Sequence, residues 1–68
     1  MYHGNMKKKD LEKKLRKHGW SLLRHGSNHD VWTNGLISEP VPRHSEINEL
    51  LAKKILKKAR NHPGINED

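Results

Sequence analysis

The stretch RHGSNHD, residues 24–30, is typical of a tight turn between two extended segments. Gly26 permits backbone angles with positive φ, and the side chains of Ser27 and Asn28 hydrogen-bond readily to nearby backbone. The residues that follow, DVWT at positions 30–33, favour a β-strand. We therefore expect a turn at Gly26 that leads directly into a strand.

His29 stands where this turn becomes a strand, close to Arg24. Imidazole titrates near neutral pH, so a histidine held by rigid backbone can take or give a proton in the cell. A solvated surface residue is the ordinary interpretation of a histidine in a turn, and a proton-transfer residue is the functional one. His25 and His29 are four positions apart but not on a helix, which indicates a metal site only weakly.

The surrounding sequence predicts three strands. Residues 20–24 form a plausible first strand, and residues 30–33 form the second. Asn34-Gly35 is the strongest short hairpin signal, so the second strand should pair antiparallel with a third at about residues 36–41. Pro40 cannot donate to a strand ladder, which places it on an edge strand or near a strand end.

A helix is expected on each side of these strands. In residues 7–18, Leu11, Leu15 and His18 share one face, and Gly19 suits the left-handed position that ends a helix.

The last helix begins at a capping residue, either Asn48 or Ser45. Its apolar stripe consists of Leu51, Ala52, Ile55, Leu56 and Ala59. Residues 1–68 are expected to form one domain, with residues 1–6 and 61–68 flexible.

The order helix, strand, strand, strand, helix predicts an α+β fold. Two amphipathic helices would cover one face of a three-stranded antiparallel sheet in a two-layer sandwich, with the other face open. Trp20 and Trp32 are expected in the sheet or the core. Trp32 would instead stack on a base if it faced the open side.

The amino-acid composition indicates which kinds of partner the chain binds. The chain has 68 residues, of which 31% are hydrophobic, and a formal net charge of +6. This charge indicates an anionic partner such as nucleic acid or an acidic protein. Cysteine is absent, which excludes disulfides and thiol catalysis. No apolar run is long enough for a membrane span or a secretion signal, so a cytoplasmic protein with no membrane partner is expected.

Three fragments, together with the order of elements, resemble HicA-type toxins of bacterial toxin–antitoxin systems. They are GSNH at residues 26–29, VPRH at 41–44 and ILKKA at 55–59, and the resemblance spans residues 6–59. It implies a fold like that of a double-stranded-RNA-binding domain and a type II toxin that acts as an mRNA-cleaving endoribonuclease. It also implies inhibition by a HicB-type antitoxin. The histidine of this family follows a Gly-Ser pair, which implies that His29 is catalytic.

RNA cleavage of this kind uses the 2′-hydroxyl of the substrate as the nucleophile, so the protein supplies a base, an acid and cations. His29 is the predicted base or acid, and no metal or other cofactor is required. Arg24 is the best local candidate for a phosphate contact. The predicted RNA-binding residues are Lys7, Lys8, Lys9, Arg24, Ser27, Asn28 and Arg43.

Two other functions fit the same features. A non-catalytic RNA-binding module would have the same basic charge and the same order of elements. A purely structural partner would dock its basic surface on an acidic antitoxin. The expected partners are mRNA and the antitoxin, and no binding to DNA by the chain alone is expected.

Overall fold

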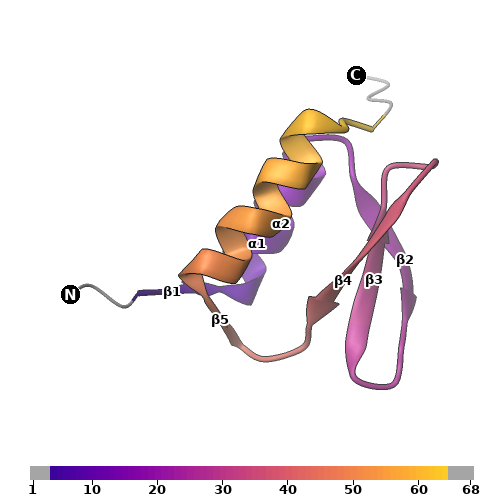
Figure 1. Ribbon diagram of the computed structural model, residues 1–68. Coiled ribbons are helices and arrows are strands. Elements are labelled where there is room, and N and C mark those ends of the chain that lie inside the picture. The colour runs from indigo at the N-terminus through magenta and orange to yellow at the C-terminus, as the bar shows by residue number, and fades with distance from the viewer. Residues whose placement is uncertain (1–3, 65–68) are drawn as a thin grey trace.

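The computed structural model describes residues 4–64, and it has the expected α+β fold in two layers (Figure 1). Helices α1 (Lys8–Lys17) and α2 (Glu49–Asn61) lie side by side. They cover one face of a sheet formed by β2 (Ser21–His25), β3 (His29–Thr33) and β4 (Ser38–Pro42). The expectation of flexible ends at residues 1–3 and 65–68 lies outside the described residues.

The three-stranded sheet is antiparallel in the order β2-β3-β4, as predicted. The β3–β4 connection contains Asn34-Gly35, and Gly35 has the positive φ of +101° that this turn signal predicts. The loop spans residues 34–37, so β4 begins at Ser38, two residues later than expected. β4 is an edge strand, which is why Pro40 is tolerated within it.

A β-bulge interrupts the pairing of β2 with β3 and changes which residues face each other. Leu22 lies opposite Trp32, but the next pair is Arg24 with Val31, so Leu23 is the extra residue. After the bulge, His25 lies opposite Asp30. A one-residue insertion moves every later side chain of the strand to the other face of the sheet.

The core lies between the helices and the inner face of the sheet. Trp32 is buried there, with Arg16 stacked 5.0 Å from its ring centroid, so it is not on the open face where it could stack on a base. Trp20 is also buried, as expected, and its indole Nε1 donates to the backbone oxygen of His62 at 2.8 Å. The buried apolar residues are Leu11, Leu15, Trp20, Trp32, Val41, Ile47, Ala52, Ile55 and Ala59.

The structure has two short strands that the sequence did not suggest, and their pairing connects the starts of the two helices. β1 (Asn5–Lys7) pairs antiparallel with β5 (Glu46–Asn48). The pairing is extended by hydrogen bonds from Lys8 N to Ser45 O at 2.9 Å and from Glu49 N to Gly4 O at 3.0 Å. Asn5 and Met6, the last two residues of the expected lead-in, thus pair in β1, because the side-by-side helices bring these two distant segments together.

The helix ends follow local chemistry. Of the two candidate caps for α2, Asn48 is confirmed, since its side chain accepts hydrogen bonds from Leu50 N and Leu51 N. Gly19 ends the turn after α1 with a φ of +84° and lies against Gly64. Neither helix of the described chain is long and apolar enough to cross a membrane.

Candidate functional site

His29 is the first residue of β3, and its side chain is exposed. Successive side chains of a strand point to opposite faces, and the next residue, Asp30, is buried on the helix side. His29 therefore faces the open side of the sheet, at the closed end of the β2–β3 hairpin, away from the end of α2 (Figure 1).

The backbone of the turn holds His29 closely. Gly26 N donates a hydrogen bond to His29 O at 2.7 Å. A Cβ atom at position 26 would also lie 2.7 Å from that oxygen, which is too close for any other residue without a shift of the backbone. Gly26 does not have a positive φ, contrary to the expectation from sequence. Glycine is needed at position 26 because the backbone oxygen of His29 approaches its Cα too closely for a side chain.

Arg24 shares the open face with His29. It lies opposite Val31, two residues along β3 from His29, so the two side chains are diagonal neighbours. Diagonal neighbours lie about 7–8 Å apart, within reach of a long side chain. Ser27 and Asn28 are exposed in the turn between them. The predicted closeness of Arg24 and His29 thus follows from the strand register.

On the other face of the hairpin, the buried carboxylate of Asp30 contacts the side chains of three residues. His25 Nδ1 lies 2.7 Å from Oδ1, Arg43 Nε donates to Oδ1 at 3.0 Å, and Lys8 Nζ donates to Oδ2 at 2.9 Å. The Asp30 side chain is only 4% exposed, whereas that of His25 is 66% exposed. We call these four residues the Asp30 cluster.

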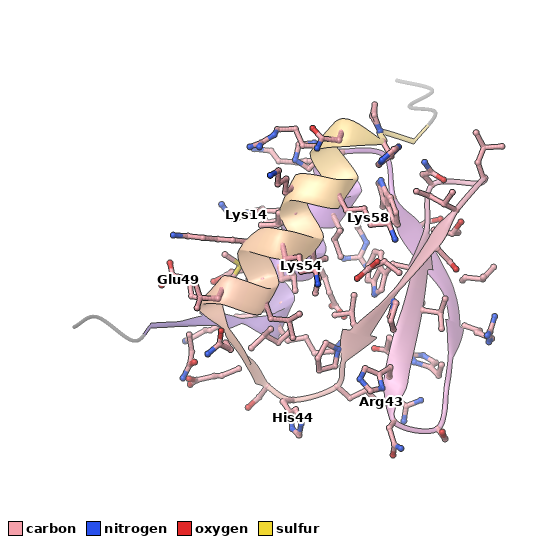
Figure 2. The ribbon with its side chains drawn as sticks, viewed as in Figure 1. Lys14, Arg43, His44, Glu49, Lys54 and Lys58 are labelled. Carbon is pink, nitrogen blue, oxygen red and sulfur yellow. The ribbon has the colours of Figure 1, made fainter. Side chains whose placement is uncertain are left out.

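The Asp30 cluster also reaches the turn that carries His29. Arg43 Nη2 donates to the backbone oxygen of Gly26, so one guanidinium connects the Asp30 carboxylate with the turn. In Figure 2, Arg43 lies beside the closed end of the β2–β3 hairpin. The cluster joins α1, β2, β3 and the segment after β4, and it thereby fixes the geometry of this end of the molecule.

Contacts within the Asp30 cluster shift the pKa values of Asp30 and Lys8. The hydrogen bond from His25, helped by Lys8 and Arg43, lowers the pKa of Asp30 far below its usual range, although burial acts in the opposite direction. Burial opposes the charged form of Lys8, but hydrogen bonds to Glu12 and Asp30 outweigh it and raise the pKa of Lys8. Asp30 is thus an anion and Lys8 a cation at neutral pH.

Two adjoining hollows mark the surface on this side. One, of about 510 Å³, is lined by the four residues of the Asp30 cluster. The other, of about 480 Å³, shares Lys8 with the first and is otherwise lined by Lys7, Lys9, Glu12, Ser45 and Glu46. The two hollows thus meet at Lys8, and the exposed Lys7 and Lys9 line the second one.

The predicted site residues therefore fall on two faces of one hairpin end. Arg24 and His29 lie on the open face, with Ser27 and Asn28 in the turn. The remaining predicted residues, Lys7, Lys8, Lys9 and Arg43, line the hollows on the other side.

Sequence reasoning missed the pairing of His25 with Asp30. The available signal was a histidine and an aspartate on either side of a predicted hairpin turn.

Within residues 4–64, no three His, Cys, Asp or Glu side chains come together in a way that could hold a metal ion.

Comparison with known proteins gives one informative result. The family model described as HicA toxin of bacterial toxin–antitoxin matches residues 9–60, which is most of the chain and includes the three-stranded sheet and nearly all of α1 and α2. No curated protein and no solved structure matches the chain significantly. On the strength of the family match, the chain belongs to the HicA toxin family of bacterial toxin–antitoxin systems.

Proposed function

We propose that this toxin is an endoribonuclease that cleaves mRNA in the cytoplasm and so blocks translation and growth. The observation that carries the proposal is the exposed His29 beside Arg24 on the open face of the sheet. A histidine and a guanidinium at adjacent positions can serve proton transfer and phosphate binding on one phosphodiester. Membership of the HicA family supports the same function.

The proposed reaction starts from the ribose itself. The 2′-oxygen attacks the adjacent phosphorus as its proton is taken by a base, and the bond from phosphorus to the 5′-oxygen breaks as an acid protonates that oxygen. The products are a 2′,3′-cyclic phosphate and a 5′-hydroxyl. His29 supplies one of the two proton transfers, and each such transfer typically contributes a factor of about 10²–10⁴ in rate.

Cations would hold the substrate and stabilise the charge that develops on the phosphate oxygens. Arg24, Lys7 and Lys9 are the best candidates because their side chains are exposed. Lys8 and Arg43 already form ion pairs with Asp30, so their contribution to RNA binding is smaller. Ser27 and Asn28 would donate hydrogen bonds to the backbone of the RNA from the turn.

The partner of the toxin in this proposal is a HicB-type antitoxin. A chain with a formal net charge of +6 favours an acidic partner surface. Inspection of the adjacent open reading frame tests the pairing: it should encode a small HicB-like protein whose co-expression restores growth.

The cleavage proposal is tested with purified protein and a synthetic RNA, with and without a chelator. We expect wild-type protein to cleave in both conditions and His29→Gln to lose about 10²–10⁴-fold in rate. His62→Gln is the matched control, because His62 is exposed at the opposite end of the molecule and its hydrogen bonds in the described structure come from its backbone. Unchanged cleavage by a folded His29→Gln variant would remove the catalytic role. RNA binding without cleavage by the wild type would identify a non-catalytic RNA-binding module.

A further inference from the structure

The surface of the two helices that points away from the sheet carries a separate concentration of positive charge. Both helices begin at the β1–β5 pair, so they run side by side in the same direction (Figure 1). On α2, Lys58 contacts Glu39 of β4 and marks the side toward the sheet (Figure 2). Lys53, Lys57 and Arg60 recur every three or four residues on the other side and form one exposed stripe.

Helix α1 has the same arrangement. Lys8 and Arg16 both contact side chains of β3 and so mark the side toward the sheet. Lys14 and Lys17 are exposed on the other side, and Figure 2 shows Lys14 on the side of the helices away from the sheet. We call the five cations of the two stripes the basic helix face, and they are Lys14, Lys17, Lys53, Lys57 and Arg60.

The positive charges of the basic helix face are not neutralised by acids of the protein. None of its five side chains forms an ion pair with another described residue. Glu12, Asp30 and Glu39 form their ion pairs toward the sheet. Asp10 and Glu49 lie in the first turns of the helices, before the cations of each stripe. The face therefore keeps a net positive charge even with these two acids included.

The open face of the sheet has much less charge. Of the described residues that the strand pairing places there, Arg24 is the only one with a full charge at neutral pH. One guanidinium beside His29 gives little affinity for a long strand, because affinity for nucleic acid grows with the number of phosphates that are neutralised. The candidate catalytic residue and the basic helix face thus lie on opposite faces of the molecule.

The residue types of the basic helix face fit a phosphate backbone better than a protein. Four of the five are lysines, which are depleted in protein–protein interfaces, and the aromatic residues typical of such interfaces are missing because both tryptophans are buried. The helix dipole accounts for cations in the last turn of α2, but Lys53 and Lys57 precede that turn. From Lys53 to Arg60 the stripe extends about 10 Å, the length of about three phosphates at about 3.4 Å each.

We propose that the basic helix face is a second RNA-binding surface, which holds the phosphate backbone of long RNA without regard to base sequence. Because this surface and His29 are on opposite faces, only a strand long enough to pass around the molecule contacts both. The surface therefore raises the affinity for long RNA and takes no part in the chemistry. The inference rests on RNA as the ligand of the proposed function but not on His29 as the catalyst.

The test measures binding of a long 2′-O-methyl RNA of mixed sequence, which is not cleaved because it lacks the nucleophilic 2′-hydroxyl. In the triple variant Lys14→Gln/Lys53→Gln/Lys57→Gln, the slope of log K against log salt should fall in magnitude by about 2, at about 0.7 for each lost contact. Binding at low salt should weaken roughly 10–100-fold. With cleavable long RNA, KM should rise and kcat should stay unchanged.

Lys57→Gln and Lys58→Gln form a matched pair, because they remove the same charge from neighbouring positions of α2. Lys57 belongs to the basic helix face, whereas Lys58 is paired with Glu39 toward the sheet. The magnitude of the salt slope should fall by about 0.7 for Lys57→Gln and stay unchanged for Lys58→Gln.

Three results would overturn the inference. An unchanged salt slope for the triple variant would show that these lysines are only solvated. Equal slopes for Lys57→Gln and Lys58→Gln would show that overall charge, rather than this face, determines binding. Loss of antitoxin binding by the triple variant, with RNA binding intact, would identify a protein interface. Because the probe is never cleaved, a wild-type protein that binds it but cuts no RNA would remove the proposed cleavage and leave this surface in place.

Discussion

Replacement of Asp30 by alanine should be among the most destabilising single changes in this protein. The change removes three charge-assisted hydrogen bonds, those from His25, Lys8 and Arg43. Hydrogen bonds to charged groups contribute about 1.5–3 kcal/mol each. The three partners are 66%, 19% and 44% exposed, in that order, so each regains part of its hydration when Asp30 is lost.

Lys8 also keeps its ion pair with Glu12. Because the partners are partly rehydrated and Lys8 keeps this ion pair, the net effect is smaller than the sum of three hydrogen bonds. We expect Asp30→Ala to lower the free energy of unfolding by about 2–4 kcal/mol at pH 7. The whole stability expected for a chain of this length is about 3–10 kcal/mol. The variant should therefore be close to the limit of folding at 37 °C.

The effect should depend on pH in one direction. The folded state lowers the pKa of Asp30, so the stabilisation from Asp30 is fully present above its unfolded pKa of about 3.9. As the pH falls below about 4, through the range between the unfolded and folded pKa, this stabilisation is lost. The difference between wild type and Asp30→Ala should therefore narrow from pH 5 to pH 2.

Urea denaturation measures both quantities, because the fluorescence of the buried Trp20 and Trp32 reports unfolding. Asp10→Ala is the matched control: Asp10 is an exposed acid in the first turn of α1, and its loss should cost less than about 1 kcal/mol. Two results would refute the reasoning. One is a loss below about 1 kcal/mol for Asp30→Ala at pH 7, and the other is a difference from wild type that does not change between pH 5 and pH 2.

Two further predictions concern the ends of the helices and the turns. Asn48→Ala removes the side-chain acceptor for two backbone N–H groups at the start of α2 and should cost about 1 kcal/mol, as measured by thermal unfolding. Gly19→Ala should destabilise the protein more than Gly35→Ala in urea denaturation. Both glycines have positive φ, but a Cβ at position 19 would lie 2.7 Å from the backbone oxygen of Gly64, whereas position 35 has no atom within 4 Å among the described residues. Equal losses would show that contact with Gly64 has no energetic effect.

Local patterns predicted much of the fold correctly. The spacing of Leu11 and Leu15 identified the buried face of α1, and Asn34-Gly35 identified the β3–β4 hairpin. Asn48 was one of two candidate caps for α2. These features depend on residues within a few positions of each other, so their physical causes are visible in the sequence.

The pairing of β1 with β5, by contrast, could not be predicted from the local sequence. Each strand has only three residues, and Asn5 pairs with Asn48 across most of the chain. Neither segment has an alternating pattern long enough to indicate a strand. The pairing exists because α1 and α2 pack side by side and bring the segments before them together.

The sequence by itself determined the order of the two helices and the three strands between them, the apolar faces of the helices and the turn that carries His29. The tertiary structure alone decided which histidine meets Asp30. In a regular register Arg24 would lie opposite Asp30, but the bulge at Leu23 puts His25 there. A bulge changes the face of every later residue in a strand, and it depends on packing against the rest of the protein rather than on a local signal.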